Sequence, residues 1–278
     1  MQLMLEVFSH TFMVRAIVVG LLVSLCAALL GVNLVLKRYA MIGTGLSHVG
    51  FAALVVAGLI DFIPFSELAI SLIVVIAAAF FLLRLNESNK INGDSAVALI
   101  STGGLAIGVI VMGLTTGITL HICNILFGSI LGITAADMHL SIVLSAIVLV
   151  LFVLFYKQLF AVTYDENFAR ATGTKVEFYK TLLSLLTAIT VVLGMRMMGA
   201  LLIASLTLFP ALSAMRVCKR FLSVVITAGV IGITCFFVGM MLSFELDLPP
   251  GASVVGVNLI VFVVLCGVSF IKRGGIKA

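Results

Sequence analysis

Residues 157–180, KQLFAVTYDENFARATGTKVEFYK, are the longest polar interruption in the chain, and they separate two groups of very apolar segments. Thr163 is followed three residues later by Glu166, a spacing typical of a capping box at a helix N-terminus. A helix is therefore expected to start near Tyr164. Its neighbours on both sides are long apolar runs, so the sequence predicts an isolated helix, about nine residues long, between two longer ones.

Gly173 marks the expected end of this short helix, because glycine readily adopts the left-handed conformation that stops one. Thr174 with Glu177 repeats the capping pattern just before the apolar run that includes Leu182. A helix this short is not stable alone in water, since nucleation costs more than so few hydrogen bonds return. It therefore needs a surface on which to dock.

The segment DENFARATG, residues 165–173, resembles the coupling helix by which the permease subunit of an ABC importer fits into a groove on its ATPase. The alternative interpretation is an ordinary polar loop with one helical turn. The remainder of the chain bears on this choice.

The composition indicates a polytopic integral membrane protein of the all-α class. Hydrophobic residues make up 63% and charged residues 10% of the chain, and the mean hydropathy is +1.37. A typical soluble domain has roughly 25% charged residues. The net charge of +5 does not indicate a nucleic-acid partner, because no stretch combines a basic groove with stacking aromatic residues. The five cysteines show no CxxC spacing and are expected to behave as small apolar residues.

Apolar runs of about 20 residues predict eight or nine membrane-spanning helices in a single permease domain, residues 1–278. The predicted spans lie near 11–36, 41–60, 66–84, 95–113, 138–157, 176–195, 197–216, 221–243 and 253–271. Residues 114–134 are apolar but short and broken by glycine, so a re-entrant or half helix is expected there, packed inside protein or lining water.

The lysines and arginines predict the orientation. If the spans alternate, most of these residues lie on one side, which is then cytoplasmic, and only Arg15 and Arg196 fall elsewhere. The segment around 163–175 lies on that same side, where an ATPase could contact it. The chain is therefore expected to be a multi-pass protein of the cell membrane.

His48 is the main candidate for chemistry inside the membrane, because ionisable residues there are rare and often functional. Thr44 precedes it by four residues and shares its helix face. A neutral imidazole can bind zinc, which hydroxyls assist only weakly. The alternative is a histidine that hydrogen-bonds across a helix interface. His121, in the expected re-entrant stretch, is either part of an outer entrance for a cation or a simple interfacial residue.

Five motifs, taken together, resemble the permease of the zinc and manganese type of ABC importers, in the same order and at similar spacing. They are YAMIGTGLSHVGFAAL, ILFGSILGIT, YDENFARATG, MRMMGALLIASLTLFPALSAMR and LPPGASVV. The resemblance covers nearly the whole chain. It implies an ABC importer permease fold of the metal and cobalamin type, a homodimer with a central pathway, two cytoplasmic ATPase subunits and an extracytoplasmic metal-binding protein. It also implies that Asp165, Glu166, Ala169 and Gly173 couple the permease to the ATPase.

Two positions depart from the family pattern. The family usually has aspartate at the position of Thr44, and a second aspartate at that of His121. Both departures remove a carboxylate oxygen, which favours zinc over manganese. The metal ligands expected from this resemblance are His48, Thr44 and His121.

The expected function is therefore import of a divalent transition metal, most simply zinc, with manganese or iron as alternatives. The chain contains no GxxxxGK[ST] run, so ATP must be hydrolysed by a partner, and no enzymatic activity or cofactor of its own is expected. An ion-gradient-driven transporter and a membrane hydrolase are the rival classes, but we find neither inverted repeats nor an HExxH motif. Because imidazole binds metal only when neutral, uptake is expected to weaken in acid.

Overall fold

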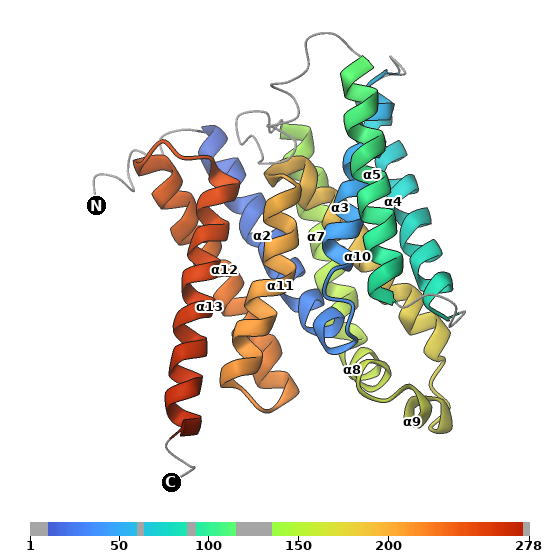
Figure 1. Cartoon of the computed structure of the whole chain (residues 1–278), viewed down its shortest axis with the longest axis vertical. Helices are drawn as coiled ribbons and strands as arrows, with labels where there is room; N and C mark the ends of the chain where they lie inside the picture. Colours follow the sequence, from blue (N-terminus) through green and yellow to red (C-terminus); the bar gives the residue numbers. More distant parts are fainter. Residues whose placement is uncertain (1–10, 60–63, 88–92, 115–134, 275–278) are drawn as a thin grey trace.

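A computed structural model describes residues 11–59, 64–87, 93–114 and 135–274 of the chain. These residues form eleven helices and no strand (Figure 1). Helices suit apolar segments because each satisfies its backbone hydrogen bonds internally, as lipid requires. The helices are α2 (Thr11–Leu36), α3 (Ile42–Leu59), α4 (Pro64–Glu87), α5 (Gly93–Leu114), α7 (Ala135–Leu154), α8 (Tyr156–Tyr164), α9 (Glu166–Ala171), α10 (Val176–Met198), α11 (Ala200–Val217), α12 (Phe221–Glu245) and α13 (Pro250–Gly274).

The all-helical membrane architecture is confirmed, but the number of spans is not. Within the described residues, six helices are long and apolar enough to cross a membrane, or seven if the bent pair α7 and α8 counts as one span. The difference arises at α3 and α4, whose apolar stretches are shorter, Ile42–Gly58 and Ile70–Leu82. The expected re-entrant stretch and His121 lie outside the described residues.

The bend between α7 and α8 was not predicted, since one span was expected over 138–157. The axes of the two helices differ by 69°. Phe155 joins them with φ −98° and ψ 14°. As a result α8 turns away from α7 at one end of the bundle and leads into α9 (Figure 1).

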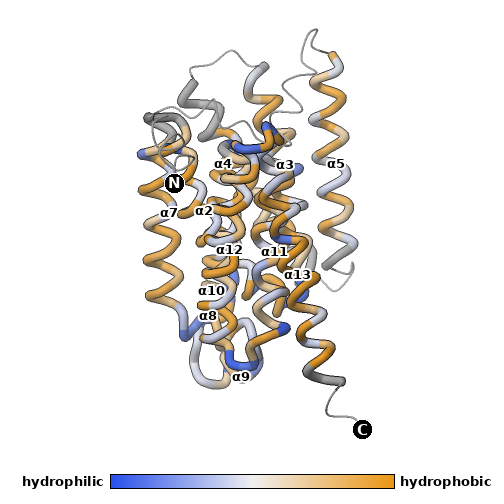
Figure 2. Tube along the Cα trace, turned by 90° about the vertical axis from the view of Figure 1, so that its left-hand side faces the viewer, coloured by the Kyte–Doolittle hydropathy of each residue, from blue (hydrophilic) through white to orange (hydrophobic). Residues whose placement is uncertain are grey.

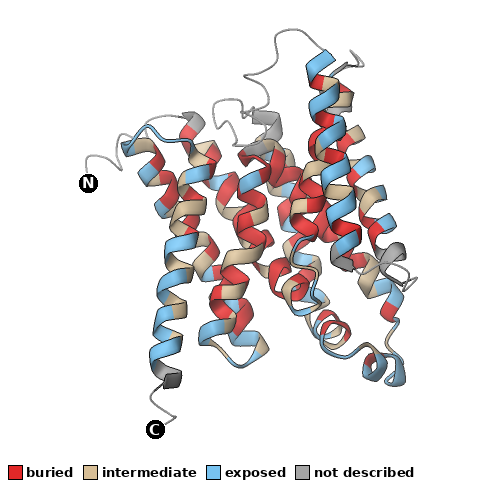
Figure 3. Cartoon of the chain, in the orientation of Figure 1, coloured by how far each residue is buried: buried red, intermediate tan, exposed pale blue. Residues whose placement is uncertain are grey.

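α2 occupies the centre of the bundle, where it packs against α7, α10, α11 and α12. Figure 3 shows that burial is concentrated around these helices, whereas α5 and α13 expose long faces. Two glycines permit close contacts with Thr207 of α11. A Cβ on Gly31 would collide with the Thr207 carbonyl oxygen, and a Cβ on Gly43 would lie 2.8 Å from its hydroxyl. α2 and α3 therefore both touch α11 at one residue.

Small residues permit close contact where α5 packs on α3. A Cβ on Gly104 would lie 3.0 Å from the backbone nitrogen of Val49, and one on Gly108 would strike the ring of Phe51. Gly113, by contrast, faces open space. Close packing in this pair of helices therefore depends on the first two glycines.

One end of the bundle collects the polar segments, as the charge pattern predicted. The C-terminal end of α2, the helices α8 and α9, the turn between α11 and α12 and the end of α13 all lie there (Figure 1). The hydropathy colouring agrees, with strongly hydrophilic residues at α9 and apolar residues along the long helices (Figure 2).

Candidate functional site

The short helix α9 begins at Asp165, and not with the expected capping box. The Asp165 side chain accepts hydrogen bonds from the backbone N–H groups of Asn167, at 2.9 Å, and Phe168, at 3.0 Å. The prediction of a Thr163 and Glu166 capping box was therefore wrong. Thr163 instead lies buried in the last turn of α8, and its hydroxyl donates to the side-chain oxygen of Asn33 in α2 at 3.1 Å.

The end of α9 is formed as expected at Gly173, which has φ 81°. Its N–H donates to the carbonyl of Arg170, and the next N–H, of Thr174, donates to that of Ala169. Ala169 is fully buried. The helix has six residues, fewer than expected. Its inward face packs against residues at the end of α8 and the start of α10, Val162 and Val176.

The second expected cap was also wrong. Lys175 occupies the N-cap position of α10 and makes no side-chain capping bond. The carboxylate of Glu177 is instead paired with Arg170 at the surface, where both side chains are largely exposed.

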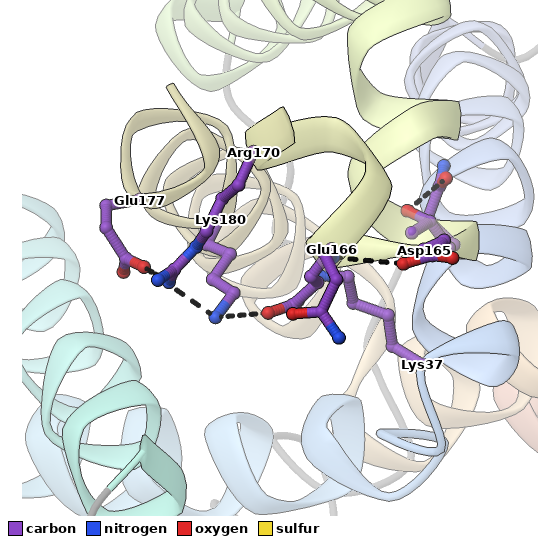
Figure 4. A network of polar contacts seen from close by, with 9 residues as sticks. Lys37, Asp165, Glu166, Arg170, Glu177 and Lys180 are labelled. Carbon is purple, nitrogen blue, oxygen red and sulfur yellow. Dashed lines mark hydrogen bonds and ion pairs between the residues drawn. The ribbon is translucent and has the colours of Figure 1, made fainter. Parts of the chain in front are cut away.

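Glu166 is held by two lysines from two long helices (Figure 4). Its Oε1 lies 3.1 Å from Nζ of Lys37, just after α2, and its Oε2 lies 2.7 Å from Nζ of Lys180 in α10. The Lys37 side chain is only 7% exposed and that of Lys180 14%, against 40% for Glu166. Sequence reasoning treated the two lysines only as orientation charges, because nothing in the sequence shows that they converge.

The charges in this cluster shift the titration of its members. Burial by itself would raise the pKa of Glu166, but the hydrogen bonds and charges of Lys180 and Lys37 outweigh it and hold that pKa below its usual value. Burial lowers the pKa of Lys37, and the nearby Glu166 carboxylate only partly offsets this effect. The carboxylate is therefore ionised and fully engaged at neutral pH.

The outer surface beside α9 is aromatic. Tyr164 is 80% exposed and Phe168 64% exposed, although both are large side chains. Tyrosines and other aromatic residues in such positions are typical anchors of protein interfaces. This surface therefore has the chemistry of a docking site.

His48 lies in α3, and its Nδ1 is 2.7 Å from the hydroxyl oxygen of Ser101 in α5. The contact is possible because Gly104, one turn further along α5, allows the two backbones to approach closely. Thr44 is half-buried one turn before His48 on the same helix. Sequence reasoning missed Ser101. The available signal was that Ser101 lies one turn before Gly104 and two turns before Gly108, which places all three residues near one face of α5.

The described residues contain no group of three or more His, Cys, Asp or Glu side chains arranged to hold a metal ion. One chain therefore offers, in its described part, an imidazole with hydroxyls nearby, and no closed cage. An adjoining cavity of about 460 Å³ between α3, α4 and α5 is lined by apolar residues, among them Val49, Ala52 and Ile107, and provides no metal ligand.

A comparison with protein families matches residues 9–269 to the ABC 3 transport family. The chain belongs to this family. A probable iron transport system membrane protein of Haemophilus influenzae is 30% identical over 272 residues, which are 97% of this chain and 98% of the relative. The manganese transport system membrane protein MntC of Listeria monocytogenes is 26% identical over 256 residues, 91% of this chain and 89% of the relative.

Solved structures share the fold of this ABC 3 family chain. PsaBC from Streptococcus pneumoniae, in complex with Fab, matches with a TM-score of 0.83 and 24% identity, covering 97% of this chain and 94% of that one. An inward-facing conformation of a putative metal-chelate type ABC transporter matches with a TM-score of 0.78 and 17% identity. The match covers 91% of this chain and 85% of that one.

Membership of the family establishes the class of protein. The chain is a multi-pass membrane permease of a metal ABC importer and not an enzyme, and ATP is hydrolysed by a separate subunit. The family also implies a substrate-binding protein as partner. An ion-gradient-driven transporter, one of the rival classes, is thereby excluded.

Proposed function

We propose that this permease imports zinc through a pathway that includes His48, and that α9 is its contact with the ATPase. The observation that carries the proposal is the hydrogen bond of 2.7 Å between His48 Nδ1 and the Ser101 hydroxyl, in which either atom can donate according to the tautomer of the ring. A histidine that binds metal through one nitrogen donates a hydrogen bond from the other. We propose the tautomer in which Nδ1–H donates to the Ser101 hydroxyl, because it leaves Nε2 to bind the ion.

The ligands favour zinc. Imidazole suits zinc, whereas manganese prefers carboxylate and other oxygen ligands. Thr44 contributes a hydroxyl where a carboxylate would favour manganese, and His121 is proposed as a second imidazole, nearer the outer mouth. A few ligands of moderate strength suit a transport site, since the ion must also leave.

Manganese or iron import is the second candidate function. The relatives favour it, since MntC is named for manganese transport. YfeD of Yersinia pestis is named for transport of chelated iron, and it is 25% identical over 96% of this chain and 89% of its own length. Uptake of the three ions by one preparation distinguishes the candidates.

A second copy of the chain is proposed to complete the site. Two chains supply two His48 imidazoles to one ion, which a single chain does not. The outer face of α5, next to the helix of His48, is free to meet the partner, since Leu99, Ile107 and Ile110 are all more than half exposed. We keep the proposal of eight or nine spans per copy, because nine helices in the described part of the chain have 18 residues or more, although six or seven of them pass as spans by length and hydropathy.

For the ATPase contact, we propose that four residues shape and hold α9: Asp165, Glu166, Ala169 and Gly173. The exposed surface is provided by Tyr164 and Phe168. Asp165 caps the helix, Ala169 fills the contact with α8 and α10, and Gly173 ends it. A contact with the ATPase accounts for a short helix that is anchored at both ends and yet exposes the ring of Phe168, next to that of Tyr164 at the end of α8.

The test is ATP-driven uptake by proteoliposomes that contain the chain with and without its ATPase. We expect uptake only with the ATPase, and expect the double variant Glu166→Gln with Gly173→Ala to insert normally but transport poorly. Full ATP-driven uptake by the double variant would show that the coupling assignment is wrong.

A further inference from the structure

The segment that contains α9 is tied to the end of α2 at two points, one buried and one partly buried. The Thr163 hydroxyl donates to Asn33 Oδ1 at 3.1 Å, and Lys37 Nζ donates to Glu166 Oε1 at 3.1 Å. Asn33 and Lys37 are four residues apart and so lie on the same face at the end of α2. We define these four residues as the α2 clamp. Their two bonds join parts of the chain separated by 129 and 130 residues.

The Thr163 bond to Asn33 is buried, and the Lys37 bond to Glu166 is partly buried, with Glu166 40% exposed. Asn33 is fully buried, Thr163 is 9% exposed, and the Lys37 side chain is 7% exposed. A surface ion pair contributes little, but removing one partner of a buried pair leaves an uncompensated charge. The pair of Arg170 and Glu177, in the same segment, is largely exposed and is therefore a surface ion pair.

The clamp leads directly to the helix of His48. Lys37 is followed by a tight turn in which Arg38 has φ 62°, the Tyr39 N–H donates to the carbonyl of Leu34 at 2.8 Å, and the Ile42 N–H donates to that of Tyr39 at 3.0 Å. This is the hydrogen-bonding pattern of a Schellman motif, followed by the first residue of α3. A displacement of Lys37 is therefore passed to α3 over only a few ordered residues.

We infer that the α2 clamp passes movement of the ATPase-docked α9 to α2 and, through the turn after Lys37, to the helix that carries His48. This inference rests on the proposed ATPase contact of α9. It makes Lys37, Asn33 and Thr163 positioning residues, which touch neither the ion nor the ATPase. α10 needs no clamp, because only residues 172–175 separate it from α9 in the chain.

The variants are chosen to cut the clamp without removing α9. Lys37→Met removes the link to α2 and leaves Glu166 paired with Lys180. Asn33→Leu with Thr163→Val replaces both hydrogen-bonding partners by apolar groups, a change that is often nearly neutral for folding. Lys37→Arg keeps the charge. Arg170→Met is the matched control, because it breaks the exposed ion pair of the same segment.

The experiment uses the assembled complex in proteoliposomes and measures three quantities: copurification of the ATPase, the rate of ATP hydrolysis, and zinc or manganese taken up per ATP. For Lys37→Met combined with Asn33→Leu and Thr163→Val, we expect copurification and hydrolysis to persist while uptake per ATP falls at least about fivefold, the lower end of usual coupling energies. Lys37→Arg and Arg170→Met are expected to retain normal coupling.

Normal uptake per ATP in the combined variant would overturn the inference and leave the proposed function intact. Loss of ATPase copurification in Lys37→Met would also overturn it, since the clamp would then shape the docking surface instead of transmitting movement. Absence of ATP-driven uptake in the unaltered complex would overturn the proposed function, and this inference with it.

Discussion

At the scale of single residues, the His48 and Ser101 pair gives the most direct prediction. In the proposed tautomer, Ser101→Ala removes the acceptor of Nδ1–H, so we expect the KM for zinc uptake to rise about tenfold or more, as is usual when a partner of a metal-binding histidine is lost. Ser101→Thr keeps the hydroxyl and is expected to restore uptake. Nitrogen NMR of the histidine rings should show the Nδ1–H form of His48 in the unaltered chain and its loss in Ser101→Ala. An unchanged ring spectrum in Ser101→Ala would contradict the assignment.

Glu166 provides a prediction about pH. Its pKa in the folded chain lies below the ordinary pKa of a glutamate, about 4.3. Glu166 therefore stabilises the fold at any pH above the ordinary pKa. This stabilisation is lost as the pH falls through the lower pKa of the folded chain. Carbon NMR of labelled glutamate carboxyls, with the Glu166 signal assigned from Glu166→Gln, is expected to show a midpoint below the ordinary one. Lys180→Met is expected to move this midpoint upward. A midpoint at or above the ordinary value would show that the lysines do not hold the carboxylate.

Sequence reasoning identified Gly173 and predicted its conformation, because few residues other than glycine favour a positive φ. It chose the wrong cap, because Thr163 and Asp165 are both good N-cap residues and lie two positions apart. The choice between them is made by Asn33 and Lys37, which come from a distant part of the chain and which no local pattern reveals.

At the scale of helices, α9 is held together by its cap. Asp165→Ala removes both hydrogen bonds to the first turn, so we expect a loss of helix stability of about 1 kcal/mol. Hydrogen exchange of residues 167–172 in the purified permease measures it. Asp165→Asn retains a capping oxygen and is the control. If Asp165→Ala exchanged no faster than the unaltered chain, then packing of Ala169 alone would hold α9.

The long helices were predicted well, because a run of apolar residues long enough to cross lipid has few alternatives to a helix. The break between α7 and α8 was missed because Phe155 and Tyr156, at the break itself, continue the apolar run. The span count was uncertain for a related reason, since length and hydropathy do not separate a short span from a buried helix at α3 and α4.

At the scale of the whole molecule, the proposal requires two copies of the permease. We expect Ile110→Cys, on the exposed face of α5, to form a crosslinked dimer in native membranes, because this face lies beside the helix of His48. Val264→Cys, exposed on α13, is the matched control and is expected to remain uncrosslinked. An assembled complex with a single copy of the permease would contradict the dimer.

The central claim is that this permease of the ABC 3 transport family imports zinc by way of His48. The direct test is ATP-driven uptake of zinc and manganese, measured side by side in proteoliposomes with the ATPase. The unaltered chain is compared with His48→Ala and with His139→Ala, an exposed histidine on α7. We predict a preference for zinc, a loss of zinc uptake of at least about tenfold in His48→Ala, and normal uptake in His139→Ala. A preference for manganese would contradict the choice of ion, and unchanged zinc uptake in His48→Ala would remove this residue from the pathway.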